Sequence, residues 1–315
     1  MKSELKNKTM RDSFFDSLYG IAKKDKNLYL ISADMGAPAL DKFRKDFKKQ
    51  FINVGIAEEN MVLVATGLSL CGKKAYIYAI MPFVTSRCYE MLKVDLSLMN
   101  IPVTAIGVGA GFGYDDSGPT HHCTEDIAIM RALPNFYIFS PSDSLMAYKL
   151  AEITYKLKFP SYVRLDRKML PQIYDEKTDF SDGLSILKEG KDFYIIGTGN
   201  MTHRAIEVSE ELKKYKIDAG VIDLYRIKPI NEKLLIERIK NIKGIITIEE
   251  HLLSGGMGSA VVEVFVDNGI KLPIKRFGVK DKYLYTYGGR ENIQKVCGLD
   301  KNSVIKGILE WVKKI

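Results

Sequence analysis

The sequence predicts an α/β protein made of two doubly wound domains, each with a mainly parallel sheet. Three observations predict this class. Short apolar runs of strand length alternate with helical patterns in the first half of the chain, and the same alternation restarts near residue 191. The runs are continuously apolar, as in parallel strands that helices cover on both faces. With 315 residues, the chain is long enough for two domains of ordinary size.

The first domain is expected at residues 1–165. An amphipathic pattern at residues 10–23 predicts a helix, and the apolar run LYLISA at residues 28–33 predicts the strand after it. Further apolar runs of strand length lie at residues 51–54, 74–80, 102–108 and 135–139. Helical patterns separate them at residues 58–70, 84–99 and 142–156. The last pattern begins with SPSD, which offers an N-cap, a proline at the first helical position and an acid in the first turn.

In residues 166–190 the alternation of strand and helix patterns stops, and the segment is charged and polar. We expect a linker there, or a crossing segment with one short hairpin. The alternation then restarts in a second domain at residues 191–315. Its expected strands lie at residues 192–197, 217–223, 244–249 and 274–277. Its expected helices lie at residues 201–214, 231–239, 256–265 and 303–313.

Composition argues against several classes of function. The longest apolar stretches are half the ~20 residues that a membrane helix needs, and the N-terminus MKSELKNKTM has no apolar core of a secretory signal. The four cysteines have neither a CxxC motif nor a regular spacing, which indicates the cytoplasm. The net charge of +8 comes mainly from dispersed lysine pairs, without an arginine-rich stripe or an aromatic platform. Nucleic acid is therefore not an expected partner.

Three glycine-rich segments could expose their backbone to a ligand. GVGAGFG at residues 107–113 follows an apolar strand, and we expect a loop at the carboxyl edge of the sheet, where ligands bind in open α/β sheets. GTG at residues 197–199 lies between a strand and a helix, as phosphate loops do. It lacks the third glycine of the dinucleotide fingerprint, and the chain has no P-loop. LSGGMGS at residues 253–259 is explained equally well by close backbone packing.

Two acids begin an otherwise apolar helix in the segment FINVGIAEENMVLVATGLSL. Glu58 and Glu59 would both stabilise the positive end of the helix dipole. Successive residues lie ~100° apart around a helix, so one acid can face solvent while the other points into the sheet edge. A carboxylate among Ile56, Met61 and Val62 would have its pKa raised by desolvation and could act as a neutral donor. Spacing alone does not choose between the two acids.

The segment DDSGPTHHCTED holds two of the four histidines of the chain, His121 and His122. Metal binding is a weak explanation, because adjacent residues point apart and the segment lacks zinc-type spacing. The histidines could otherwise be acid–base catalysts or ordinary turn residues. The segment follows the glycine-rich loop directly, so it is expected at the same sheet edge.

These segments, taken in order, resemble the family of transketolases and 1-deoxyxylulose-5-phosphate synthases. FINVGIAEENM is similar to the segment with the catalytic glutamate, and DSGPTHH to the substrate-site loop. LPNFYIFSPSD is similar to the strand and turn that follow this loop, and TIEEHLLSGGMGSAVVE to the start of the C-terminal domain. The matches cover about residues 10–310. The resemblance implies a thiamine-diphosphate-binding pyrimidine domain followed by a transketolase C-terminal domain.

The chain has no GDG motif, which in this family belongs to the diphosphate-binding domain together with an Asn-containing metal segment. The resemblance therefore implies the C-terminal subunit of a split transketolase, active only with an N-terminal partner subunit. That partner would carry the diphosphate and most of the Mg²⁺ site, in an α2β2 heterotetramer in which this chain also self-associates. The implied reaction moves a two-carbon ketol unit from a ketose, expected to be phosphorylated, to an aldose through a thiamine diphosphate carbanion.

The resemblance assigns catalytic and cofactor-binding roles. Glu58 matches the glutamate that hydrogen-bonds a ring nitrogen of the thiamine aminopyrimidine and favours the imino tautomer, which deprotonates the thiazolium carbon. A neutral carboxylic acid suits that role. Phe83, in MPFVTSRCYE, matches the aromatic ring that stacks on the aminopyrimidine, with a core aromatic as the alternative; Ile56 is a further expected cofactor contact. His121 matches the histidine of GPTH near the reacting carbonyl, where a proton donor stabilises developing charge.

The resemblance also assigns substrate-binding roles. Arg167, in YVRLDRK, and Arg11, in TMRDS, resemble phosphate-binding arginines, whose planar fork suits a sugar phosphate. An ordinary ion pair is the alternative for both. Arg87 and Asp34 are further expected substrate contacts. Ser117 stands where pentose-phosphate transketolases usually have the acid of DGPTH, so the donor or acceptor is expected to differ from the usual pentose phosphates.

Two other functions compete with this interpretation. The beta chain of a 2-oxo acid dehydrogenase or decarboxylase shares the domain order, but GPTHH followed by LPNFYIFSPSD fits transketolases better. A non-catalytic chain that only binds a partner is disfavoured because Glu58, Phe83 and His121 are all retained. His122 is expected to support the loop or the subunit contact.

Overall fold

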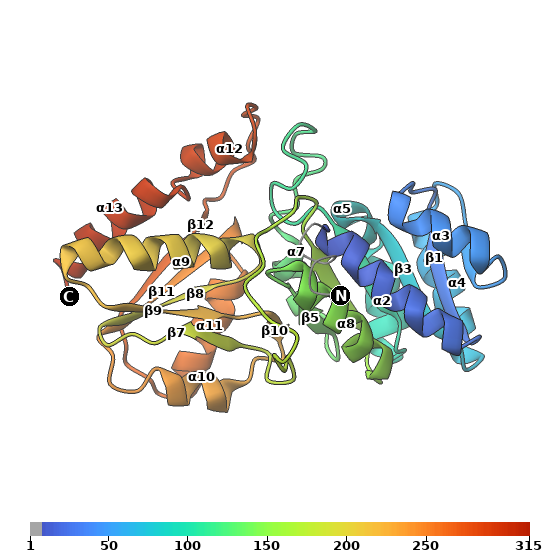
Figure 1. Cartoon of the computed structure of the whole chain (residues 1–315), viewed down its shortest axis with the longest axis horizontal. Coiled ribbons are helices and arrows are strands. Elements are labelled where there is room, and N and C mark those ends of the chain that lie inside the picture. The colour runs from blue at the N-terminus through green and yellow to red at the C-terminus, as the bar shows by residue number, and fades with distance from the viewer. Residues whose placement is uncertain (1–7) are drawn as a thin grey trace.

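The structure is a computed structural model that describes residues 8–315. Two α/β domains lie side by side, each with a central sheet covered by helices (Figure 1). Residues 1–7, on which the expectation about a secretory signal partly rests, lie outside the described residues. Over residues 8–315, no helix is long and apolar enough to span a membrane.

The first sheet has seven strands in the order β10-β5-β6-β4-β3-β1-β2. All strands except β10 come from the first half of the chain and run parallel. They are β1 (Leu28–Ser32), β2 (Phe51–Asn53), β3 (Lys74–Ile80), β4 (Thr104–Val108), β5 (Tyr137–Phe139) and β6 (Ser161–Leu165). β6 was not anticipated from the sequence.

Helices cover both faces of this sheet, and β3 shows why its sequence is apolar throughout. Tyr76 and Tyr78 belong to the core that α2 (Met10–Lys24) and α8 (Ser144–Lys156) form on one face. Ala75 and Ile77 belong to the core that α4 (Glu58–Leu70) forms on the other face. Because alternate side chains point to opposite faces, a strand covered on both sides must be apolar at every position.

The remaining helical segments of the first domain are short and include the main departure from the sequence prediction. They are α3 (Pro38–Asp46), α5 (Met81–Val84), α6 (Tyr89–Met91), a π-helix (Leu92–Leu98) and α7 (Asp126–Arg131). The single helix predicted at residues 84–99 is therefore confirmed only over residues 89–98, because turns at residues 85–88 interrupt it. Helix α5 ends at Val84. The N–H and the side-chain hydroxyl of Thr85 both donate to the Met81 carbonyl (3.1 and 2.7 Å) and close its last turn. The chain resumes as a helix only at Tyr89.

The second sheet has five strands in the order β12-β11-β8-β9-β7. They are β7 (Ser185–Lys188), β8 (Phe193–Gly197), β9 (Ala219–Asp223), β11 (Gly244–Leu252) and β12 (Ile274–Val279). Only β7 is antiparallel, at the edge. Helices α9 (Asn200–Leu212), α12 (Arg290–Cys297) and α13 (Lys301–Val312) share one core of this domain. The other face carries α10 (Glu232–Arg238) and α11 (Met257–Asp267). The prediction of two mainly parallel α/β sheets is confirmed.

The segment between the two sheets is neither a plain linker nor a hairpin. Its single strand, β7, pairs with β9 of the second sheet. In the opposite direction, β10 (Arg226–Lys228) leaves the second half of the chain and pairs antiparallel with β5 of the first sheet. Main-chain hydrogen bonds therefore tie the connecting segment to the second sheet, and β10 of the second half to the first sheet.

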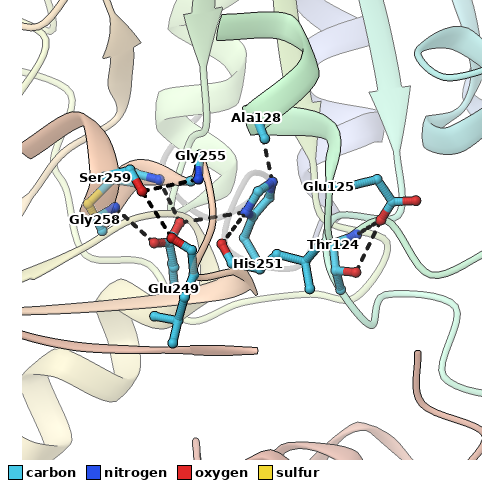
Figure 2. A network of polar contacts seen from close by, with 12 residues as sticks. Thr124, Glu125, Ala128, Glu249, His251, Gly255, Gly258 and Ser259 are labelled. Atoms are coloured by element: carbon cyan, nitrogen blue, oxygen red, sulfur yellow. Dashed lines mark hydrogen bonds and ion pairs between the residues drawn. The ribbon is translucent and has the colours of Figure 1, made fainter. Parts of the chain in front are cut away.

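A buried polar network also joins the domains at the carboxyl end of β11 (Figure 2). His251 Nε2 accepts the backbone N–H of Ala128 in α7 (3.3 Å), and its Nδ1 donates to the Leu252 carbonyl (2.8 Å). Both ring nitrogens are satisfied by the neutral tautomer, and burial lowers the pKa of His251 to about 4. Glu249 accepts the N–H groups of Met257 and Gly258 at the start of α11 (2.6 and 2.8 Å).

The glycines of LSGGMGS serve this close packing. A Cβ on Gly256 would lie 2.3 Å from a carboxylate oxygen of Glu249. The packing explanation of this segment therefore agrees with the structure. Similarly, a Cβ on Gly197 would lie 2.8 Å from the backbone of Thr202, so this glycine brings β8 close to α9.

Candidate active site

The expected site residues gather at the carboxyl edge of the first sheet. Asp34 follows β1, Glu58 follows β2, Phe83 follows β3, His121 lies in the loop after β4, and Arg167 follows β6. Because neighbouring strands are parallel, the segments after them converge at one edge, which is where open α/β sheets bind ligands.

Glu58 is the first residue of α4, and its carboxyl group is buried at 5% exposure, whereas Glu59 is exposed. The structure therefore distinguishes the two acids that the sequence left open. One expected feature of its surroundings is wrong, because Ile56 is 80% exposed and does not enclose the carboxylate. Gly55 has a positive φ of 76° and turns the chain just before it. Instead of an apolar wall, Glu58 has an ion pair from its Oε1 to Nη1 of Arg87 (2.7 Å).

Arg87 connects this carboxylate to an aromatic cluster. Its guanidinium lies 4.3 Å from the centre of the Phe83 ring. The Phe83 ring in turn meets His121 edge-on, with ring centres 5.3 Å apart. Phe83 is only half-buried: it packs against the core of the first domain and keeps part of its surface open. Carboxylate, guanidinium, aromatic ring and imidazole therefore form one row.

Tyr114 extends the row beyond His121, with ring centres 5.8 Å apart. Arg167 lies over the Tyr114 ring at 4.4 Å and also contacts Asp116 (3.3 Å). Tyr114 can reach this position because residue 109 is glycine: a Cβ on Gly109 would lie 2.3 Å from the tyrosine ring. Sequence reasoning missed Tyr114, although an aromatic residue directly after the glycine-rich loop was a usable signal.

The remaining expected residues lie at different distances from this row. Burial raises the pKa of Tyr114, and the charges of Arg167 and Arg11 oppose that rise. Arg11 itself forms an ion pair with the adjacent Asp12 (3.0 Å). Ser117 lies in the same loop and donates to Asp116 (2.9 Å). Asp34 has no such link: it is exposed, and its carboxylate accepts from the Asn53 side chain (3.2 Å).

The two adjacent histidines point in different directions. His121 faces Phe83 and Tyr114, and its Nδ1 lies 3.0 Å from the Thr120 hydroxyl. His122 is buried against Phe112, toward the second domain, and burial lowers the pKa of its imidazole. Only His121 therefore belongs to the row. Within residues 8–315, no three histidine, cysteine or acidic side chains stand close enough to hold a metal ion.

Comparison with known proteins agrees with this geometry. Residues 6–172 match the family model of the transketolase pyrimidine-binding domain, and residues 183–304 match that of the transketolase C-terminal domain. The chain is 33% identical to a putative transketolase C-terminal section of Methanocaldococcus jannaschii, over 98% of this chain and 97% of the relative. It is 34% identical to one of the subunits of the apulose-4-phosphate transketolase of Phocaeicola vulgatus, over 96% of this chain and 97% of the relative.

Among solved structures, a split gene transketolase described as an inactive beta4 tetramer is similar, with a TM-score of 0.86 and 30% identity. The match covers 96% of this chain and 97% of that chain. Fold and site thus define a chain of the transketolase type, with a pyrimidine-binding domain followed by a C-terminal domain. The chain belongs to the transketolase family of thiamine-diphosphate-dependent transferases and corresponds to the C-terminal half of a two-subunit transketolase.

Proposed function

We propose that this chain supplies the pyrimidine-binding side of a thiamine diphosphate site that an N-terminal subunit completes. The assembly transfers a two-carbon ketol unit from a ketose to an aldose. The observation that carries this proposal is the row of Glu58, Arg87, Phe83 and His121 at one sheet edge. It combines a buried carboxyl group, an aromatic face and an imidazole within a few contacts of one another.

These residues fit the aminopyrimidine part of the cofactor. A flat, polar ring needs an acid that can bond its nitrogen and apolar surface for its faces. Glu58 offers the buried acid, Phe83 a half-buried ring, and Ile56 an exposed apolar side chain. The diphosphate and Mg²⁺ need several oxygen ligands, and no cluster of acids or histidines suited to a metal occurs among residues 8–315. We therefore assign both to the partner subunit.

When bound, thiamine diphosphate would supply a nucleophilic carbon for the carbonyl of the ketose. Glu58 holds a proton against the aminopyrimidine ring, and Phe83 fixes the plane of that ring. His121 donates a hydrogen bond where negative charge develops on the substrate oxygen. Arg87, whose side chain is 42% exposed beside Glu58, is assigned to the substrate contact. Arg167 and Arg11 bind the phosphate group, and Asp34 contributes a more distant polar contact.

The partner subunit would cover an apolar surface beside this edge. Exposed apolar residues lie on or next to α4 and the π-helix, which pack together: Ile56, Leu63, Leu70, Val94, Leu98 and Met99. Exposed apolar side chains gathered on packed helices are typical of a protein interface. A solved relative is an inactive tetramer of beta chains. We infer the same self-association here, with an α2β2 heterotetramer as the active form.

The substrate is expected to be a phosphorylated sugar outside the usual pentose phosphates. Ser117 takes the place of the acid that such enzymes carry before GPTH, and a relative acts on apulose 4-phosphate, as its name says. We also assign the chain to cytoplasmic carbohydrate metabolism, in line with its four unpaired cysteines.

A reconstitution assay tests the proposal. The purified chain with thiamine diphosphate and Mg²⁺ should show no ketol transfer, and it should gain activity when the N-terminal subunit is added. Full activity of the chain alone would contradict the split arrangement. In the assembly, Glu58→Ala should abolish turnover without preventing subunit association, and near-normal turnover would reject the assigned role of Glu58.

A further inference from the structure

The loop between β4 and α7, residues 109–125, carries both Ser117 and His121, and its internal backbone hydrogen bonds are local turns and one bridge at its base. Its base is closed by Gly111 and Cys123, whose backbone groups bond each other in both directions (3.1 and 2.9 Å). Near its tip, the N–H of His121 bonds the Gly118 carbonyl (3.0 Å). These contacts close the loop on itself without fixing its direction relative to Phe83.

The C-terminal domain holds both ends of this loop. Glu250, in β11, accepts the N–H of Phe112 (2.9 Å), and Arg290 donates to the Ala110 carbonyl (3.2 Å). On the returning strand of the loop, the N–H of Leu252 donates to the Thr124 carbonyl (2.7 Å). All three contacts come from residues more than a hundred positions away in the sequence.

The same domain also holds the middle of the loop. Asp115 Oδ2 accepts the backbone N–H of Arg290, the first residue of α12 (2.7 Å), and forms an ion pair with Lys168. Its side chain is only 12% exposed. Burial opposes ionisation, but the bonds from Lys168 and Arg290 outweigh it and lower the pKa of the Asp115 carboxyl.

Beside it, the Tyr287 hydroxyl lies 3.3 Å from where a Cβ on Gly118 would stand. The segment before α12 and the loop after β4 rise next to each other above the two sheets (Figure 1). The tip of the loop is therefore in contact with the C-terminal domain.

We propose that the C-terminal domain positions the substrate loop, and that Asp115 is a positioning residue for the transfer reaction. Asp115 caps the first turn of α12 and thereby holds Ser117 and His121 at their distance from Phe83. The inference rests on the proposed function in one respect, because it assumes that His121 contacts the substrate. A displacement of about 1 Å at a reacting group can cost on the order of 10²-fold in rate.

The test uses Asp115→Ala, Asp115→Asn and the control Glu291→Gln. Glu291 is the next residue of α12, and its side chain is 78% exposed and paired with Arg204 of α9. Asp115→Asn keeps an acceptor for the Arg290 N–H but loses the charge that pairs with Lys168. It therefore separates the cap from the ion pair.

The first readout is amide hydrogen exchange of residues 110–124 in the full chain without a partner. We expect exchange about ten times faster in Asp115→Ala, a smaller increase in Asp115→Asn, and wild-type exchange in Glu291→Gln. The second readout is kcat and KM in the assembly with the N-terminal subunit. Asp115→Ala should lower kcat/KM by about 10- to 100-fold while the affinity for the partner and for thiamine diphosphate stays within twofold.

Hydrogen exchange at the wild-type rate in Asp115→Ala would overturn the inference. If the wild-type assembly is active, a kcat/KM of Asp115→Ala equal to that of the wild type would overturn it as well. A purely structural role would instead lower partner affinity and cofactor affinity together with kcat, which also contradicts the inference. An inactive wild-type assembly would refute the proposed function alone, because hydrogen exchange still decides whether Asp115 fixes the loop.

Discussion

Glu58 and Glu59 are neighbours in sequence with opposite surroundings, one buried beside Arg87 and the other in solvent. The sequence narrows the choice to these two, because helix geometry separates them by ~100°. It cannot choose further, since the phase of α4 against the sheet is set by packing of Met61 and Val62. The ion pair of Glu58 with Arg87 was not predictable either, because Arg87 lies in the turns at residues 85–88, where the sequence predicted a continuous helix.

Ser117 offers a test of substrate choice at the level of one side chain. Ser117→Asp restores the acid usual before GPTH and would add a second carboxylate beside Asp116. We expect the kcat/KM ratio between a pentose phosphate and the natural donor to rise about tenfold, or about 1.4 kcal/mol of discrimination. The measurement is a competition assay with both donors. An unchanged ratio would remove Ser117 from the specificity determinants.

Arg167 offers a test of the phosphate assignment. It pairs with Asp116 and lies over Tyr114, and its side chain is 40% exposed. Arg167→Met should raise KM for a phosphorylated substrate about 10- to 100-fold and leave the kinetics of its unphosphorylated analogue unchanged. Equal losses on both substrates would show that the residue supports the loop instead.

At the scale of elements, Asp223 at the end of β9 joins three segments. It accepts hydrogen bonds from the hydroxyls of Tyr174 (2.7 Å) and Thr202 (2.8 Å), and from Ser142 just before α8. Despite these donors, burial raises the pKa of Asp223 to about 6. The linker, the first domain and the second domain meet at this one carboxyl group.

This raised pKa predicts a pH dependence of stability. A carboxyl group that binds its proton more tightly in the folded state stabilises the fold below its unfolded pKa of about 3.9, and this contribution is lost as pH rises through 6. The unfolding free energy of the wild type relative to Asp223→Asn should therefore rise by about 2 kcal/mol between pH 7 and pH 4. Urea unfolding of both proteins at several pH values measures it. A difference that does not vary with pH, or that falls toward acid, would contradict the prediction.

Elements with a clear apolar pattern were predictable, including the three-residue strands β2 and β5, whereas several other short elements were not. The strands β3 and β4 follow their apolar signals closely. Helix α8 lies where it was predicted, but its N-cap is Asp143, which accepts the N–H of Met146, and Pro141 lies before the helix. In contrast, β10 has only three residues, and α7 and α12 have six and eight. Such segments form where tertiary contacts hold them, which no local pattern encodes.

At the scale of the whole molecule, a buried ion cluster is one of the links between the two domains. Arg290 bonds both oxygens of Asp166 (2.9 and 2.7 Å) and the carboxylate of Glu250 (2.6 Å to Oε2). Gln294 adds a bond to Glu250 (2.6 Å). The cluster links the end of the first domain to β11 and α12 of the second. It was invisible to sequence reasoning because its members lie far apart along the chain.

Replacement of Arg290 would leave the buried carboxylates of Asp166 and Glu250 without their cation. Arg290→Met should lower the free energy of unfolding by about 3–5 kcal/mol, since a buried charge left without its partner keeps its full desolvation cost. Chemical denaturation compares this variant with Glu291→Gln, which should stay within ~0.5 kcal/mol of the wild type. A loss below about 1 kcal/mol for Arg290→Met would show that the domains are held by their apolar contact instead.

The central claim, that Glu58 of this chain acts on a cofactor completed by another subunit, has a direct measurement. It is the rate at which the thiazolium proton of bound thiamine diphosphate exchanges with deuterated water. The assembly with the wild-type chain should exchange at least ~10²-fold faster than the assembly with Glu58→Ala, and the isolated chain should not accelerate exchange. Equal rates in the two assemblies, or rapid exchange with this chain alone, would contradict the account.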